Sequence, residues 1–325
     1  MHFHLGFQAP PLEQTIRYSD KLLLMGSCFA EEIGGKLGEH YFDTVINPHG
    51  ILFNPLSITH ALTTYLEGKQ YTTADLFQHN DTWNSWDHHS RFSALSPETA
   101  LDTINTAQRN AAATLADADW LIITLGSANV YVLKENNRIV GNCHKVPSAA
   151  FYKRTLTTEE VVTALDNMMH RLFFHNRKIN ILFTVSPVRY IRDGLVENNL
   201  SKAILLQSVH HLVKKFDRLF YFPAYELVID DLRDYRFYKD DLVHPNATAI
   251  NYVWEQVVKA CLSSGSRELL HTIAEINRAA QHRPFNPQSS EHQQFLRTHA
   301  QKVKQVMTAH PQLRLDALLQ YFEQL

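Results

Sequence analysis

The chain alternates short apolar runs with longer segments of helical period. Five runs are almost continuously apolar and rich in β-branched residues, at 21–25, 43–47, 119–125, 178–185 and 218–222. Six segments have helical periodicity, at 29–39, 55–67, 97–117, 157–175, 198–215 and 246–264. A strand that is apolar throughout must be covered on both faces, as in a parallel sheet between helices. The pattern therefore predicts an α/β fold of three layers, α/β/α, around a five-stranded parallel sheet.

Two insertions and a tail depart from this alternation. Residues 71–95 are aromatic and polar, and residues 130–142 alternate around Asn136-Asn137 as a β-hairpin does. Each insertion is a candidate wall or lid beside the strand ends, with surface decoration as the alternative. After residue 265 the chain is polar and helical, with a loop at 282–294 between two helices. We predict a main domain of residues 1–265 and a helical C-terminal extension of residues 266–325.

Composition argues against several classes of protein. The 31 Lys and Arg residues nearly balance the 33 Asp and Glu residues, so no global field attracts the molecule to nucleic acid or to a membrane surface. The start of the chain has no signal-peptide pattern, and no later run approaches the ~20 apolar residues that span a bilayer. We expect a cytoplasmic protein with neither a nucleic-acid nor a membrane partner. The sequence leaves the oligomeric state open.

Cysteine and histidine usage does not favour a metal or a cofactor. The three cysteines are widely spaced and odd in number, which indicates reduced thiols and no cysteine zinc site. The 19 histidines include the pairs His88-His89 and His210-His211. Neighbouring histidines do not share a helix face, and neither a His-Glu-x-x-His pattern nor a carboxylate cluster accompanies them. We therefore expect no metal and no cofactor.

Ser27 and Cys28 stand side by side where the first apolar run gives way to a helical pattern. A serine at this position caps a helix by default. It is also a candidate nucleophile, because the first amides of a helix point at any oxyanion formed there, and the backbone N–H of Cys28 is then a ready donor. Both interpretations of Ser27 stay open at this point.

A serine nucleophile needs a base, and the segment "DDLVHPN" supplies one. Asp241 and His244 lie three residues apart in a loop just before a helix that opens near Asn246. Asp241 is placed to accept the Nδ1 proton of His244, which leaves Nε2 to face Ser27. Asp-x-x-His alone is a weak pattern, and it gains weight because it follows the fifth strand.

Eight segments together closely resemble the GSCFA-domain family, and the resemblance covers roughly residues 20–285. The segments are MGSCFAEEIG (25–34), INPHGILFNPLSI (46–58), WDHHSRFS (86–93), ITLGSANVY (123–131), NCHKVP (142–147), SPVRYIRDG (186–194), DLRDYRFY (231–238) and DLVHPN (241–246). This family looks like a branch of the GDSL or SGNH-hydrolase superfamily. The resemblance implies a flavodoxin-like sheet and metal-independent ester hydrolysis by serine, histidine and aspartate.

The resemblance also implies roles for single residues. Ser27 matches the nucleophile of the superfamily, in a Gly-Ser-Cys where Gly-Asp-Ser is usual; a shift of one residue would give the role to Cys28 instead. Asp241 and His244 match the final Asp-x-x-His block. Gly50 matches an oxyanion-hole glycine by its order in the chain. The expected asparagine two residues after Gly126 is missing, so the amide donor falls to Asn129, with Asn54 and Asn142 as alternatives.

Four further residues are candidates for binding the substrate. Lys145, Arg189 and Arg192 lie in loops expected at the same rim, where they clamp an anionic group or remain solvated. Trp86 is a candidate platform for a sugar ring, with packing of the insertion as the alternative.

These residues favour a serine-dependent esterase acting on an acylated small metabolite or carbohydrate. Ser27 attacks the ester, His244 moves the proton, Asp241 orients His244, and the amides hold the oxyanion. The alternative is a non-catalytic ligand-binding or regulatory module of the same fold, because the expected asparagine is displaced. A third alternative is a metal-dependent hydrolase that uses the histidine pairs.

Overall fold

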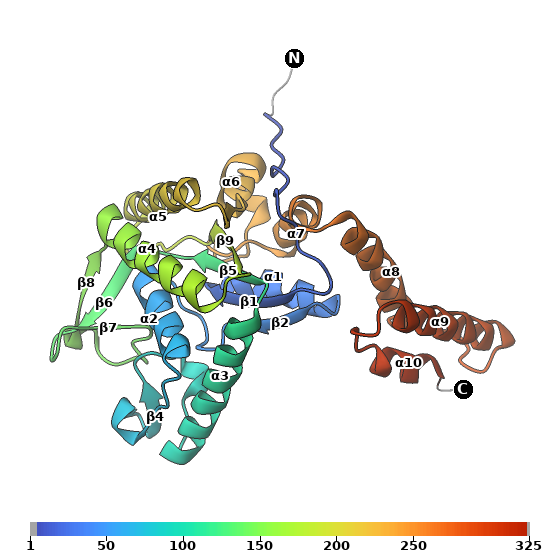
Figure 1. Ribbon diagram of the computed structural model, residues 1–325, viewed down its shortest axis with the longest axis horizontal. Helices are drawn as coiled ribbons and strands as arrows, with labels where there is room; N and C mark the ends of the chain where they lie inside the picture. The colour runs from blue at the N-terminus through green and yellow to red at the C-terminus, as the bar shows by residue number, and fades with distance from the viewer. Residues whose placement is uncertain (1–4, 324–325) are drawn as a thin grey trace.

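A five-stranded parallel sheet forms the centre of the protein (Figure 1). The structure is a computed structural model and describes residues 5–323. The strand order is β10-β9-β5-β1-β2, which is the flavodoxin-like order. All five predicted strands are present, with shifts of one or two residues at their ends: β1 (Lys21–Gly26), β2 (Asp43–Ile46), β5 (Trp120–Leu125), β9 (Asn180–Val185) and β10 (Leu219–Tyr221).

Helices cover both faces of the sheet, which confirms the predicted three-layer α/β/α fold. Alternate strand residues supply the two cores: Leu22 and Leu24 point to one face, and Leu23 and Met25 to the other. The first core includes the helices α1 (Cys28–Glu39) and α7 (Ala247–Cys261). The second includes α2 (Pro55–Leu66), α3 (Pro97–Asp117), α4 (Thr158–His175) and α5 (Leu195–Lys215). The uninterrupted apolar character of the strands follows from this double burial.

Three predicted helix boundaries are wrong by three or more residues. The helix expected at 198–215 begins at Leu195, and the loop expected at 282–294 ends where a helix begins at Ser290. The helix expected at 246–264 ends at Cys261, and a new helix, α8, begins at Ser264. Leu262 and Ser263 between them are extended, because Leu262 forms a β-bridge with Ile16 near the start of the chain. The Ser263 hydroxyl then caps α8 by accepting a hydrogen bond from the Ser266 amide at 3.2 Å.

The two insertions form antiparallel β-structure. Residues 71–95 contain the hairpin β3 (Leu76–His79) and β4 (Thr82–Ser85). In 130–142 the predicted hairpin is confirmed: β6 (Asn129–Leu133) pairs with β7 (Arg138–Val140) around Asn137, whose φ is +57°. An additional strand, β8 (Phe151–Thr155), pairs with the other edge of β6. Short helices complete the core domain: Thr73–Asp75, Ser90–Phe92, Ser148–Ala150, α6 (Ala224–Glu226), Leu227–Leu232 and Tyr235–Phe237.

Three helices form the C-terminal part of the described chain: α8 (Ser264–Ala280), α9 (Ser290–Ala309) and α10 (Asp316–Glu323). They project to one side of the sheet (Figure 1). Leu269 and Ile273 of α8 belong to the same buried cluster as α1 and α7. The boundary predicted after residue 265 therefore falls in the first turn of a helix that packs on the main core. No helix within residues 5–323 has the length and apolarity needed to cross a bilayer.

Asp87 ties both insertions to helix α2. It is only 5 % exposed, and its carboxylate accepts hydrogen bonds from Arg138 of β7 at 2.7 Å and from Tyr71 at 3.3 Å. His60 Nε2 of α2 lies 3.2 Å from the same carboxylate. Burial alone would raise the pKa of Asp87, but His60 and the Arg138 guanidinium outweigh it and hold that pKa well below its usual range. The carboxylate is therefore charged in the folded protein.

We predict that Asp87→Asn lowers the free energy of unfolding by about 2 kcal/mol at neutral pH, because it removes one partner of a largely buried ion pair whose arginine regains some water. Urea unfolding measures the change, with the exposed Asp102→Asn as a control expected to stay within about 0.5 kcal/mol. The folded-state pKa lies below the unfolded value near 4, so the difference between wild type and Asp87→Asn should shrink as pH falls below about 4. Equal stability of the two variants at neutral pH would contradict the prediction.

Candidate active site

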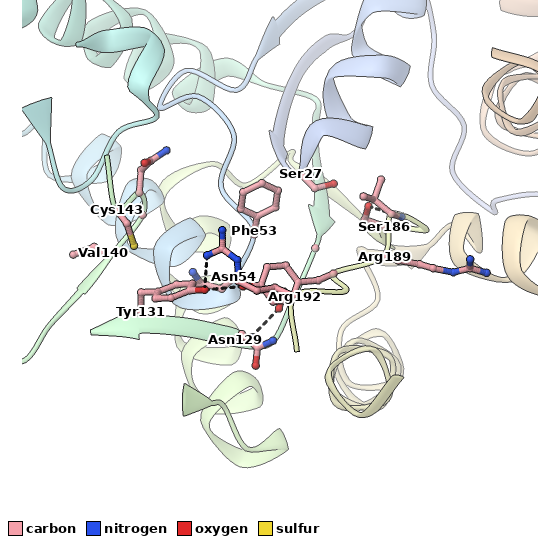
Figure 2. Close-up of a pocket in the computed structure, with 16 residues that line it drawn as sticks. Ser27, Phe53, Asn54, Asn129, Tyr131, Val140, Cys143, Ser186, Arg189 and Arg192 are labelled. Atoms are coloured by element: carbon pink, nitrogen blue, oxygen red, sulfur yellow. Dashed lines mark hydrogen bonds between the residues drawn. The ribbon is translucent and has the colours of Figure 1, made fainter. Parts of the chain in front are cut away.

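A cavity of about 360 Å³ opens where the parallel strands end (Figure 2). Ligands of open α/β sheets gather at this edge. The loops after β1, β2, β5 and β9 supply its sixteen lining residues together with the hairpin of β6 and β7 and the segment that follows it. These are Ser27, Phe53, Asn54, Gly126, Ser127, Asn129, Tyr131, Val140, Gly141, Asn142, Cys143, Ser186, Val188, Arg189, Tyr190 and Arg192.

Ser27 is both a helix cap and a cavity residue. Gly26 before it has a φ of +133°, and a Cβ there would lie 2.1 Å from the Thr124 carbonyl oxygen of β5. Only glycine allows this approach, which lets the Ser27 amide donate to that same oxygen at 3.1 Å. The Ser27 hydroxyl accepts a hydrogen bond from the Phe29 amide at 3.3 Å, so it caps α1. The helix-cap interpretation of Ser27 is therefore confirmed, and its role as a nucleophile stays a prediction that its place at the cavity allows.

Cys28 does not line this cavity. It borders a separate surface hollow together with Glu31, Glu32 and Lys36 of α1. Burial raises the pKa of the Cys28 thiol, so the thiol keeps its proton at neutral pH and is a poor nucleophile. Of the two adjacent nucleophilic side chains, the geometry thus presents Ser27 to the cavity. The backbone amide of Cys28 is the first of α1, where the helix dipole favours negative charge.

Asp241 and His244 form a hydrogen-bonded pair in the loop before α7. His244 Nδ1 lies 2.7 Å from Asp241 Oδ2, and the backbone amides of His244 and Val243 donate to Asp241 Oδ1 at 3.0 and 2.9 Å. These amides, with the His244 ring, lower the pKa of Asp241 to about 2. Because the ionised carboxylate only accepts, Nδ1 carries the proton and Nε2 is left as an acceptor. Leu242, with a φ of +57°, makes the tight turn between the two residues.

The Asp241–His244 loop adjoins the cavity wall. The backbone amide of Arg189, a lining residue, donates to the Val243 carbonyl oxygen at 3.3 Å, and the Arg189 guanidinium lies 3.5 Å from the Leu242 carbonyl oxygen. His244 itself does not line the cavity, and its side chain is 41 % exposed. Within residues 5–323, the Ser27 hydroxyl and the His244 ring make no hydrogen bond with each other.

Gly50 does not offer a free amide to an oxyanion. Its N–H donates to the Asn47 carbonyl oxygen at 2.6 Å, and Gly50 does not line the cavity. Its φ is +78°, and a Cβ at this position would lie 2.1 Å from the Cβ of His89. The need for glycine here comes from a turn packed against the insertion. We therefore remove Gly50 from the candidate oxyanion hole.

Three asparagines line the cavity as the sequence suggested, but their amide groups differ. The side-chain nitrogen of Asn54 donates to the Ser57 hydroxyl at 3.0 Å while Asn54 caps α2. The side-chain oxygen of Asn142 accepts from the His144 amide at 2.8 Å. The side-chain oxygen of Asn129 accepts from the Thr155 hydroxyl at 2.8 Å, and its buried nitrogen has no partner among the described residues. The side-chain nitrogen of Asn142 also has no partner among the described residues, but that of Asn129 is buried, and an unpaired buried donor is costly.

The four substrate-binding candidates separate into two groups. Arg189 and Arg192 line the cavity, whereas Lys145 and Trp86 do not. Lys145 is exposed outside the cavity. The Trp86 ring stacks on Phe77 of the same insertion with centroids 3.6 Å apart, and it packs against the buried cluster that includes Val140 of the second insertion. The prediction of Trp86 as a sugar platform is wrong, and the packing alternative holds.

The histidine pairs do not assemble a metal site. His88 is buried and stacks on His49 with ring centroids 4.1 Å apart. Within the described residues, no three His, Cys, Asp or Glu side chains are grouped as metal ligands would be. Burial lowers the pKa of His88 to about 3, so its ring is neutral and packs as an aromatic residue.

Lys202 of α5 is a buried cation that sequence reasoning missed. It is 2 % exposed, and its ammonium donates to the carbonyl oxygens of Gly126 and Ser186, both at 2.6 Å. These residues follow β5 and β9 and line the cavity. Burial lowers the pKa of Lys202 to about 7. The available signal was the helical spacing of Lys202 with the apolar residues Leu205 and Val209, which places the lysine on the buried face of α5.

Two more polar residues of α5 hold the cavity floor. The Ser201 hydroxyl accepts from the Ala128 amide at 2.8 Å, and the Asn198 side chain accepts from the Tyr190 amide at 2.8 Å. Together with Lys202, they bind the loops after β5 and β9 through backbone groups. The first turns of α5 therefore fix the shape of the cavity.

We predict that Lys202 makes stability depend on pH. Below about pH 7 both the folded and the unfolded protein hold its proton, whereas between about pH 7 and 10 only the unfolded protein does. The stability of the wild type relative to Lys202→Met should therefore rise with pH in this window, by up to about 1.4 kcal/mol per pH unit. Urea unfolding across the window measures the slope, with exposed Lys214→Met as the control. A flat difference would show that Lys202 titrates near its usual pKa.

Comparison with known families completes the description of the site. The model of the GSCFA family matches residues 21–257, which include Ser27, Asp241 and His244. A second model, described as the C-terminal domain of GSCFA domain proteins, matches residues 273–325. No protein of curated function matches the chain. Since the first match covers well over half of the 325 residues, the chain belongs to the GSCFA family.

Proposed function

We propose that the protein is a serine-dependent ester hydrolase of the SGNH type that acts on an acylated small metabolite or carbohydrate. One observation carries the proposal: Ser27 lines a cavity at the carboxyl edge of the sheet, and a hydrogen-bonded Asp241–His244 pair adjoins the wall of that cavity. A nucleophile, a base and a group that orients the base are the parts that acyl transfer needs. The flavodoxin-like strand order supports the link to this superfamily by analogy only.

In the proposed mechanism, Ser27 Oγ attacks the ester carbonyl carbon while its proton passes to His244 Nε2. Asp241 holds the ring by its Nδ1 proton throughout. The amide of Cys28 and the side-chain nitrogen of Asn129 stabilise the oxyanion. His244 then protonates the leaving alcohol, and water, activated by the same ring, hydrolyses the acyl-enzyme and restores Ser27.

The mechanism requires a change in the position of the His244 ring. Its Nε2 must come within hydrogen-bonding distance of the Ser27 hydroxyl when substrate binds. The ring is partly exposed at the loop surface, and Arg189 bridges this loop to the cavity wall. Substrate bound beside Arg189 is therefore in a position to draw the loop toward Ser27.

The volume of the cavity limits the size of the substrate. Its volume of about 360 Å³ is near the lower end for ligand pockets, which suits an acylated small molecule or a single sugar ring better than a polymer. Apolar surface from Phe53, Val140 and Val188 borders the polar groups. We place the reaction in the cytoplasm, because the three cysteines are unpaired.

We predict that Ser27→Ala reduces the turnover of a short-chain nitrophenyl ester by at least about 1000-fold, because the proposed mechanism takes its attacking oxygen from Ser27. Cys28→Ala should retain most of the activity, since Cys28 does not line the cavity and the proposed mechanism uses only its backbone amide. The two adjacent substitutions are matched controls for each other. Loss of activity in Cys28→Ala with retention in Ser27→Ala would assign the nucleophile to cysteine.

A non-catalytic binding module is the second candidate function. The occupied amide of Gly50 and the missing Ser27–His244 hydrogen bond favour it, since both weaken a preformed catalytic centre. In that case the cavity and its polar groups would serve binding alone.

A serine-directed fluorophosphonate probe separates the two functions. We predict that it labels Ser27 of the folded wild type and that His244→Gln slows labelling by at least about 100-fold, because the general base is lost. Mass spectrometry of the labelled peptide identifies the modified residue. A folded wild type that stays unlabelled would favour the binding module.

A further inference from the structure

The cavity is lined by positive and neutral groups only. Two of its sixteen lining residues, Arg189 and Arg192, are cations, and none is Asp or Glu. Lys202 lies just behind the lining, bound to the carbonyl oxygens of Gly126 and Ser186. The N-terminus of α1 adds the positive end of a helix dipole beside Ser27. Such a surface concentrates negative charge.

The Arg192 guanidinium donates a hydrogen bond to the Tyr131 hydroxyl at the cavity, marked by a dashed line in Figure 2. Their separation is 3.4 Å, and the Tyr131 hydroxyl is in turn 2.6 Å from that of Tyr190. Arg192 has no carboxylate partner among the described residues. The nearest acid in sequence, Asp193, is paired with Lys153 instead. The guanidinium therefore keeps most of its hydrogen-bonding groups for another acceptor.

Arg189 has a different role. Its guanidinium lies 4.3 Å from the ring centroid of Tyr238 and 4.8 Å from that of Tyr235, and it reaches the Leu242 carbonyl oxygen. In Figure 2 its side chain extends away from Arg192. Arg189 thus holds the loop that carries Asp241 and His244, and Arg192 is left as the cation of the cavity.

We propose that the substrate carries an anionic group, a carboxylate or a phosphate, in addition to its ester, and that Arg192 binds this group. The inference rests on the proposed function in one respect: ester hydrolysis is the reason that the other group of the substrate is taken to be an ester. The planar guanidinium matches either anion with two parallel hydrogen bonds. The hydroxyl of Tyr131 fixes the guanidinium, so less freedom is lost when the anion binds. Substrates without the negative charge leave Arg192 unpaired and bind more weakly.

Three aryl acetates that differ in one substituent test this proposal: 3-acetoxybenzoate, 3-acetoxyphenyl phosphate and neutral methyl 3-acetoxybenzoate. We expect at least one anionic ester to have a kcat/KM about tenfold or more above that of the neutral ester. Arg192→Gln should remove this preference by lowering only the values for the anionic esters. Lys134→Gln is the matched control and should keep the preference for anionic esters. Lys134 lies outside the cavity lining, in the turn of the hairpin that carries Tyr131.

Calorimetric binding of the three corresponding phenols separates this inference from ester hydrolysis. If 3-hydroxybenzoate or 3-hydroxyphenyl phosphate binds about tenfold more tightly than methyl 3-hydroxybenzoate, and Arg192→Gln abolishes the difference, the anion site stands even if no ester is cleaved. The anion that shows the effect identifies the group as carboxylate or phosphate. Equal binding of all three phenols, or an unchanged preference in Arg192→Gln, would overturn the inference while leaving hydrolysis of the neutral ester intact.

Discussion

The close contact between Gly26 and the backbone of Thr124 determines where the candidate nucleophile stands. Gly26 donates to the Asn47 side chain at 2.8 Å on the β2 side and accepts from the Leu52 amide at 3.0 Å. A side chain at Gly26 would overlap the Thr124 carbonyl group, so β1 and β5 would have to separate. Because the chain is held on both sides at this point, Ser27 leaves the sheet in one direction, and α1 starts directly beneath the cavity.

The same edge of the sheet depends on a buried charge. Loops after β5 and β9 carry carbonyl groups that neither strand can satisfy, and Lys202 reaches them from α5. Removing an ammonium from water is costly, as the lowered pKa of Lys202 shows. In return, two lining segments are fixed by one side chain, and positive charge is placed behind the cavity. Lys202 behind the cavity and Arg192 in its lining therefore both favour an anionic ligand.

Local patterns predicted the fold better than the site. Unbroken apolar runs identified the strands, because burial on both faces leaves a direct trace in sequence, and Asn136-Asn137 identified its hairpin for a similarly local reason. Lys202 was missed because its partners are backbone carbonyl groups, one of them 76 residues away. Gly50 was assigned by its order in the chain, which does not reveal that its amide is used in a turn.

Helix capping and nucleophilic attack make compatible demands on the Ser27 hydroxyl. A hydroxyl has one proton to donate and two lone pairs to accept with. The cap uses one lone pair, through the Phe29 amide, so the proton remains available for His244. As the proton leaves, charge grows on an oxygen that already accepts from a helix amide and lies at the positive end of the α1 dipole. In the proposed mechanism the cap therefore stabilises the attacking form of the serine more than its resting form, which is the requirement for an interaction that speeds a reaction.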